Sequence, residues 1–217
     1  MKICKVITLD SVDSTNSYAK RNKIAAGTCV RALSQSAGRG RLGRSFLSPG
    51  GGLYFSVILN CKQKQLATVA AAVAVASCID GCAVKWPNDI LINGKKACGI
   101  LCEGNSINDD IIIGVGINID SSPIEGSCAV GGDAEELFNR ILKGFEEIFS
   151  LLDRDPNAVL EQYSKMLMTK LVKVKVMVKG EEITGIAMGI DECGRLLVLN
   201  GDEEYRVNSG EATIIKE

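Results

Sequence analysis

The stretch Ser36-Ala37-Gly38-Arg39-Gly40-Arg41-Leu42-Gly43-Arg44 places three arginines within six residues and separates them by glycine. Each guanidinium presents a planar fork of N–H donors that binds carboxylate and phosphate groups in bidentate fashion. Glycine allows positive φ and lets the backbone N–H groups approach a ligand. The stretch therefore predicts an anion-binding loop, which we expect to be mobile until an anion orders it.

Gly38, Gly40 and Gly43 also match the G-x-G-x-x-G pattern of dinucleotide-binding folds. That pattern should follow a strand and open a helix. Residues 29–34 alternate like a strand, but residues 45–52 contain a proline and three glycines and cannot begin a helix. A Rossmann-type site is therefore disfavoured, while a solvated basic surface loop stays open as the alternative for this stretch alone.

The composition excludes several kinds of chemistry. The 217 residues have room for one sizeable core and a small appendage. The net charge of −1 gives no global basic field of the kind that nucleic-acid-binding proteins use. Histidine is absent, which excludes a Ser-His-Asp triad, a Cys-His pair, a His-ligated metal and imidazole acid–base catalysis. Chemistry must rely on Lys, Arg, carboxylates, backbone dipoles or a bound cation.

The cysteine count and the hydrophobic pattern indicate a cytoplasmic protein without a membrane partner. Nine cysteines is an odd number, and neither a signal peptide nor a bilayer-length apolar run is evident. The spacing C-x-x-x-C at Cys78/Cys82 and at Cys98/Cys102 leaves a zinc site open. Small buried thiols explain both pairs more simply.

The order of the predicted elements indicates an α+β fold. Apolar strands are expected at residues 3–9, 29–35 and 53–59, and an Ala/Val-rich buried helix at residues 65–79. A capped amphipathic helix should cover residues 134–152, and a second helix should follow Pro156. Residues 171–217 read as short strands of a small five-stranded barrel. We therefore expect a catalytic domain at residues 1–170 and a second domain at residues 171–217.

A second polar cluster, Lys85-Trp86-Pro87-Asn88-Asp89, lies between two apolar strands. Lys85 would supply a point charge for phosphate. Asn88 and Asp89 would touch a ligand or a hydrated magnesium ion, which favours few protein ligands. A plain strand-ending turn is the alternative, and it explains Pro87 but not the other polar side chains.

Five motifs together resemble biotin protein ligases, and they stand in the family's order over nearly the whole chain. The motifs are Gly38-Arg39-Gly40-Arg41-x-Gly43-Arg44, Gly52-Leu53-Tyr54-Phe55-Ser56, Lys85-Trp86-Pro87-Asn88-Asp89, Lys96-x-x-Gly99-Ile100-Leu101-x-Glu103 and Gly114-x-Gly116-Ile117-Asn118. The tail segments Gly189-Ile190-Asp191 and Ser209-Gly210-Glu211 also look like the family's C-terminal cap.

The resemblance implies an ATP-dependent biotin–protein ligase. Such enzymes form biotinyl-5′-AMP from biotin and MgATP, then biotinylate one lysine of a biotin carboxyl carrier domain of a carboxylase. The implied catalytic domain is a mixed sheet backed by helices, like that of class II aminoacyl-tRNA synthetases, followed by an SH3-like barrel. Whether the chain is a monomer or a homodimer stays open.

The resemblance also implies roles for particular residues. The residues implied for biotin are Ser14, Thr15, Asn16, Gln35, Gly38, Arg39, Gly40, Arg41, Lys96, Gly99 and Gly114. Those implied for ATP or the adenylate are Arg39, Arg41, Arg44, Phe46, Lys85, Asn88, Lys96, Gly116 and Asn118. Arg41 and Lys85 are expected to be catalytic, because they would neutralise the charge that grows as the biotin carboxylate attacks the α-phosphate. Magnesium would arrive mainly with ATP, with Asn88 or Asp89 as candidate contacts, and Asp89 is also a candidate base.

Two departures from the family pattern matter. Phe46 stands where many relatives have Trp, which changes the strength of adenine stacking. The segment Asp13-Ser14-Thr15-Asn16 comes so early that no helix-turn-helix precedes it, so we expect no DNA partner. A lipoate or octanoyl ligase and a non-catalytic biotin-binding module are the alternatives. The polar set Ser14, Thr15 and Gln35 suits a ureido ring better than a dithiolane.

Overall fold

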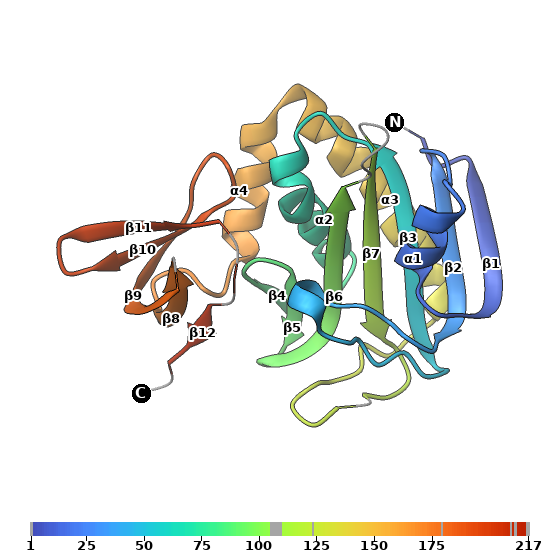
Figure 1. Ribbon diagram of the computed structural model, residues 1–217, viewed down its shortest axis with the longest axis horizontal. Helices are drawn as coiled ribbons and strands as arrows, with labels where there is room; N and C mark the ends of the chain where they lie inside the picture. Colours follow the sequence, from blue (N-terminus) through green and yellow to red (C-terminus); the bar gives the residue numbers. More distant parts are fainter. Residues whose placement is uncertain are drawn as a thin grey trace.

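Seven strands form one sheet in the order β1-β2-β3-β7-β6-β5-β4 (Figure 1). The computed structural model describes residues 2–104, 110–122, 124–178, 180–208, 210 and 212–215. The strands are β1 (Lys5–Val12), β2 (Thr28–Gln35), β3 (Gly52–Asn60), β4 (Cys82–Lys85), β5 (Asp89–Ile92), β6 (Lys95–Gly104) and β7 (Asp110–Asn118). β1 and β2 run parallel and the other neighbouring pairs run antiparallel, which confirms the mixed sheet.

The two faces of this sheet are used differently. Side chains alternate along β3, so Phe55 and Val57 join the large core that includes helices α2 (Ala67–Ala76), α3 (Ala134–Arg154) and α4 (Pro156–Met166). Ile58 points the other way, into a small cluster with Ala19 of α1 (Thr15–Arg21). The face that carries α1 is therefore left open beside that helix, and it is the face on which the polar motifs gather.

The helices follow the sequence pattern closely. α2 is buried nearly throughout, as its Ala/Val composition predicts, although a 3-10 turn (Lys64–Leu66) replaces its expected first residues. Asp133 caps α3 by accepting from the backbone N–H groups of Glu135 and Glu136 at 2.7 and 3.1 Å. Across the described part of the chain, none of the helices is long and apolar enough to cross a bilayer.

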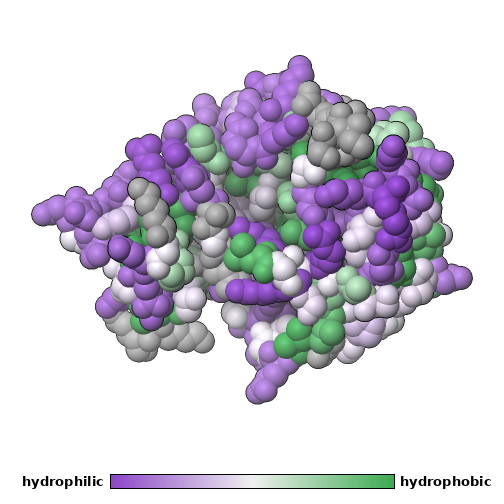
Figure 2. All heavy atoms as spheres, viewed as in Figure 1, coloured by the Kyte–Doolittle hydropathy of each residue, from purple (hydrophilic) through white to green (hydrophobic). Residues whose placement is uncertain are grey.

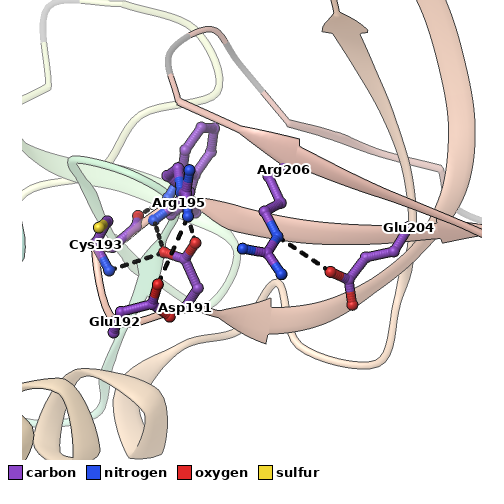
Figure 3. A network of polar contacts seen from close by, with 8 residues as sticks. Asp191, Glu192, Cys193, Arg195, Glu204 and Arg206 are labelled. Atoms are coloured by element: carbon purple, nitrogen blue, oxygen red, sulfur yellow. Dashed lines mark hydrogen bonds and ion pairs between the residues drawn. The ribbon is translucent and has the colours of Figure 1, made fainter.

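Five further strands form a second, antiparallel sheet in the order β11-β10-β9-β8-β12. They are β8 (Lys173–Val178), β9 (Glu181–Ile190), β10 (Leu196–Asn200), β11 (Glu203–Val207) and β12 (Thr213–Ile214). Asp191 shapes the turn between β9 and β10, because its carboxylate accepts from the backbone N–H groups of Cys193 and Arg195 and from Arg195 Nε (Figure 3). The predicted number of strands is confirmed.

The second sheet is docked on the first through that turn. The indole Nε1 of Trp86 donates to the carbonyl oxygen of Gly194 at 3.0 Å. Val174 and Leu196 of the second sheet belong to the same hydrophobic cluster as α2. The two sheets therefore share one continuous core.

Three of the cysteines, Cys29, Cys61 and Cys98, are buried, five are half-buried and one is exposed. Burial raises the pKa of the Cys29 thiol to about 12, and does the same for Cys102, whereas Cys4 is exposed. Within the described residues there is no group of three or more His, Cys, Asp or Glu side chains arranged to hold a metal ion.

Candidate active site

A cavity of about 100 Å³ lies on the face of the sheet that carries α1. It is bounded by the first turn of α1, the arginine loop and strands β5, β6 and β7. The 3-10 turn of the loop (Arg41–Gly43) lies near the centre of the view in Figure 1. In the same view, Figure 2 shows a small hydrophobic area near the centre, surrounded mainly by hydrophilic atoms.

Most of the residues implied by the resemblance lie on the lining of this cavity. The biotin set contributes Ser14, Thr15, Asn16, Gln35, Arg39, Gly40, Arg41, Lys96, Gly99 and Gly114. The nucleotide set adds Arg44, Phe46, Asn88 and Gly116, and Asp89 is there as well. The arginine loop and the segment Asn88-Asp89 therefore meet at this cavity, although about fifty residues of sequence separate them.

Three glycines form the floor of the cavity. Gly99 of β6 lies directly opposite Gly116 of β7, and Gly114 is two residues further along β7. A Cβ at Gly116 would collide with the ring of Phe46, and one at Gly114 would collide with the amide of Asn16. The missing side chains make room for these two groups at the sheet surface.

A polar network extends from the start of α1. Ser14 caps the helix by accepting from the backbone N–H of Ser17. The backbone N–H of Thr15 donates to Gln35 Oε1 at 2.9 Å, and Gln35 Nε2 donates to Ser48 Oγ at 2.8 Å. The buried hydroxyl of Ser56 lies 2.7 Å from Thr15 Oγ1 and 2.6 Å from Asn16 Oδ1. Alternating donors and acceptors at one end of the cavity suit a ligand with both N–H and C=O groups.

The cations at the other end contact protein oxygens. Arg41 Nη1 donates to Asn88 Oδ1 at 3.1 Å and to the carbonyl of Gly210 at 3.2 Å. Lys96 Nζ lies 2.7 Å from Asp89 Oδ1. Protein oxygens thus stand beside Arg41 and Lys96.

An aromatic contact fixes the far side of the loop. The ring of Phe46 meets Tyr54 edge-to-face at a centroid distance of 6.4 Å, and Lys96 Nζ is 5.9 Å from the Phe46 ring centre. Tyr54 Oη donates to the carbonyl of Pro49 at 2.9 Å, and burial raises the pKa of this hydroxyl to about 12. The phenol therefore stays a neutral donor and anchors the end of the loop.

Three implied residues do not line the cavity. Lys85 lies in the edge strand β4, directly opposite Asp89, so its side chain is on the cavity face but one strand further out. Gly38 is turned toward Gln35 and Ser48, and its carbonyl accepts from the backbone N–H of Phe46. Asn118 is buried at the end of β7 and donates to the carbonyl of Cys128.

Two residues near the site carry no role in the sequence analysis. Ser56 is buried inside an otherwise apolar strand, and Glu103 reaches both Arg39 and Asn16. The signal for Ser56 is its place between Phe55 and Val57, which alternation turns to the opposite face. Glu103 stands at the end of a quoted motif, but its contacts depend on the register of β6 against β7.

Comparisons with known proteins agree with the geometry. A model of the "Biotin/lipoate A/B protein ligase family" matches residues 8–118, and one of the "Biotin protein ligase C terminal domain" matches residues 172–213. The chain is 30% identical to the bifunctional ligase/repressor BirA of Escherichia coli over 220 residues, which cover 89% of this chain and 68% of that protein. It is 29% identical to the biotin–[acetyl-CoA-carboxylase] ligase of Paracoccus denitrificans, covering 88% of this chain and 92% of that one.

Coverage differs among the relatives. BirA of Bacillus subtilis is 43% identical over 129 residues, so the match spans 53% of this chain and only 39% of that protein. Among solved structures, the biotin protein ligase of Aquifex aeolicus in complex with biotin and ATP superimposes with a TM-score of 0.83 at 29% identity. That match covers 98% of this chain and 99% of the Aquifex chain. With both family models matched in order and the fold shared over its full length, this chain belongs to the biotin protein ligase family.

Proposed function

We propose that this chain is an ATP-dependent biotin–protein ligase. It joins biotin to ATP as biotinyl-5′-AMP with release of pyrophosphate, and then transfers the biotinyl group to a lysine of a biotin carboxyl carrier domain. The observation that carries the proposal is one cavity with hydrogen-bonding groups of α1 at one end and Arg39, Arg41 and Lys96 around the rest.

The polar end suits the ureido ring of biotin. Ser14, Thr15 and Gln35 bring hydroxyl and amide groups to the lining, and each is tied to a neighbour that limits its rotation. A dithiolane ring has no N–H or C=O group with which to form hydrogen bonds to this set, whereas the ureido ring has both. The match to a C-terminal domain named for biotin protein ligases also favours biotin over lipoate.

The cationic end suits the first chemical step. The biotin carboxylate and the α-phosphate are both anionic, so the barrier includes their mutual repulsion. Arg39 and Arg41 stand on the loop above the cavity, and Lys96 stands on β6 beside it. Removing one such stabilising group typically lowers the rate by about 10²–10³-fold. We assign Arg41 and Lys85 to this charge neutralisation, with Lys85 extending inward from β4 when the triphosphate is bound.

The cavity must widen to hold the adenylate. A volume of about 100 Å³ is well below the roughly 300–1,000 Å³ of ordinary ligand pockets. Phe46 fills the space above Gly116, and the loop that carries it is the natural part to move. In the proposal, Phe46 and Asn88 face the nucleotide once the loop has opened, and Gly38 and Asn118 shape the backbone around it.

Magnesium is proposed to enter with the triphosphate. The chemistry of Asn88 and Asp89 suits a hard cation, but Arg41 and Lys96 already engage Oδ1 of these residues. Two protein oxygens at most fit the usual pattern in which phosphates and water complete the shell of a magnesium ion. Bound in this way, the ion would neutralise phosphate charge, while the residues of the chain orient the reacting groups.

The second step requires a neutral acceptor lysine. Asp89 supplies the carboxylate on the cavity lining, and we propose it as the base that removes the proton.

The proposal also covers the organisation and location of the protein. It divides the chain into a catalytic domain that ends at residue 170 and a second domain that begins at residue 171. It includes no DNA binding, because the net charge is −1, and it places the enzyme in the ATP-rich cytoplasm. A homodimer is compatible with it, and the mass of the protein in solution decides that point.

A carrier assay tests the proposed function. The full chain is incubated with biotin, MgATP and a biotin carboxyl carrier domain, and the intact mass of the carrier is measured. We expect an increment of one biotinyl group that requires both biotin and ATP. A parallel reaction with lipoate and a lipoyl domain tests the other ligase activity, and labelling there but not with biotin would overturn the assignment.

A further inference from the structure

Glu103 lies outside the cavity lining but contacts two residues that are on it. Its oxygens are 3.0 and 3.1 Å from Nη1 of Arg39, and Oε2 accepts from Asn16 Nδ2 at 2.9 Å. Its side chain is 19% exposed, while Asn16 is 3% exposed. Glu103 stands on β6 opposite Ile112 of β7, on the same face of the sheet as the cavity. One carboxylate thus joins the arginine loop to the start of α1.

The charge of Glu103 strengthens one orientation of the Asn16 amide. An ionised carboxylate only accepts hydrogen bonds, so Asn16 must turn its NH₂ group toward Glu103. The same NH₂ group also donates to the carbonyl of Leu101 at 3.3 Å. The amide oxygen is then left facing Ser56, whose hydroxyl lies 2.6 Å away. Without the carboxylate the buried amide loses its shorter and charged acceptor and keeps only the 3.3 Å contact to Leu101 on that side.

Glu103 also holds Arg39 beside the cavity. Arg39 is on the loop, and its side chain is 46% exposed. A long, exposed side chain of this kind loses rotamer freedom when a contact fixes it. The carboxylate contacts Nη1 from below, on the side of the sheet, and limits the positions that the guanidinium visits. An exposed ion pair alone would contribute only about 0–1 kcal/mol, but this carboxylate is shared with a buried amide.

We propose that Glu103 is a positioning residue for the biotin end of the site. It fixes the Asn16 amide above Gly114 and keeps Arg39 close to the place where the biotin carboxylate binds. The inference rests on the proposed function for the identity of the ligand. Because Glu103 acts through other side chains, it changes binding of biotin more than the chemical step.

The test compares Glu103→Gln with Glu182→Gln in the full chain. Gln has nearly the shape of Glu, so it removes the charge with little change in packing. Glu182 is the matched control, because it forms a 2.9 Å ion pair with Lys175 in the second sheet and is not on the cavity lining. Biotin affinity is measured by calorimetry, and KM and kcat by pyrophosphate release.

We expect Glu103→Gln to raise the Kd and KM for biotin about tenfold, the worth of one charge-assisted hydrogen bond, with kcat within about twofold. Glu182→Gln should leave all three values unchanged. In an Asn16→Ala background, Glu103→Gln should raise the Kd for biotin by at most about a further threefold, because the two residues act as one unit. Full additivity, or an unchanged affinity, would overturn the proposal, and so would an equal loss in kcat.

A second measurement separates this inference from the proposed function. In the ligand-free protein at neutral pH, the side-chain amide resonances of Asn16 should differ between the wild-type chain and Glu103→Gln, and they should be unchanged in Glu182→Gln. The carrier assay on the wild-type chain decides the ligase activity on its own. If the carrier is labelled but the Asn16 signals are unchanged in Glu103→Gln, the positioning role is wrong and the function stands. If the signals differ in Glu103→Gln but no biotin binds, the proposed function is wrong and the biotin role falls with it.

Discussion

Arg39, Arg41 and Lys96 each contact a protein oxygen, so an anionic ligand that binds through the same N–H groups exchanges partners with the protein. A hydrogen bond to a charged group contributes roughly 1.5–3 kcal/mol net, so the exchange recovers only the difference between two such bonds. The resemblance to biotin protein ligases implies most of the residues that line the cavity, but Gly38, Lys85 and Asn118 are not on its lining. The sequence does not predict that Glu103 contacts Arg39 or that Asp89 contacts Lys96, since those contacts depend on how β5, β6 and β7 align.

Lys85 tests the assignment of charge neutralisation at the level of one residue. Lys85→Ala should lower the rate of adenylate formation by about 10²–10³-fold, because the variant lacks the positive charge that neutralises the negative charge developing on the phosphate. The affinity for biotin should stay within about threefold, since Lys85 does not line the cavity. Biotin-dependent pyrophosphate release and calorimetry measure the two quantities. Lys143→Ala, on the exposed surface of α3, is the control, and a loss of biotin affinity equal to the loss of rate would contradict the role.

The thiols provide a second prediction for single residues. Burial raises the pKa of Cys29 and of Cys102 to about 12, so at pH 8 both stay protonated and are poor nucleophiles. We expect iodoacetamide to alkylate Cys4 in the native protein within minutes and to leave Cys29 and Cys102 unmodified. Peptide mass spectrometry identifies the labelled sites, and unfolding in urea should make all of them reactive. Labelling of Cys102 at the rate of Cys4 would show that the thiol is accessible.

The elements that the sequence predicts best are those with a strong local pattern. The 3.6-residue period of residues 134–152 predicts a helix, and the structure has α3 at Ala134–Arg154. The first strand is expected at residues 3–9 and runs instead through Lys5–Val12, because it pairs in parallel with β2 as far as Gln35. Strands that pair in a sheet are often distant in sequence, so the local pattern of one strand does not predict its partner.

The two glycines of β7 give a prediction about that strand. Gly114→Ala places a methyl group against the Asn16 amide, so it should weaken biotin binding about tenfold or more and affect ATP less. Gly116→Ala places it against Phe46 and should mainly raise the KM for ATP. Gly104→Ala is the control, since no atom of the described residues lies within 4 Å of a Cβ there. Calorimetry of each substrate separates the two effects. Equal losses of biotin affinity in both variants would contradict the assignment of one end of the cavity to biotin and the other to ATP.

At the scale of the whole molecule, the fold class follows from the sequence but the strand order does not. Length, composition and the change of pattern near residue 170 predict a larger α+β part and a smaller β part. The order β1-β2-β3-β7-β6-β5-β4 depends on contacts between remote segments. It is this order that brings the lining residues of β5, β6 and β7 next to the loop. It also leaves Lys85 on the edge strand, where a motif alone does not place it.

The shared core predicts that the two sheets unfold together. Trp86 is the only tryptophan of the chain, and its indole donates to Gly194 of the second sheet, so its fluorescence reports on their contact. In urea, the transition followed by this fluorescence should coincide with that followed by far-UV circular dichroism. Trp86→Phe, followed by circular dichroism, should lower the unfolding free energy by about 0.5–1.5 kcal/mol or more, through the lost hydrogen bond. A fluorescence change well before the loss of ellipticity would show that the second sheet detaches first.

The hydrogen bond from Arg41 to the carbonyl of Gly210 has a practical bearing on how the enzyme is produced. Gly210 stands shortly before β12 (Thr213–Ile214), the last of the described strands, which pairs with β8. A purification tag or fluorescent fusion on that side of the chain would be attached within a few residues of a backbone group that touches the arginine loop. A fusion on the N-terminal side avoids that neighbourhood, so it is the better choice for measuring rates.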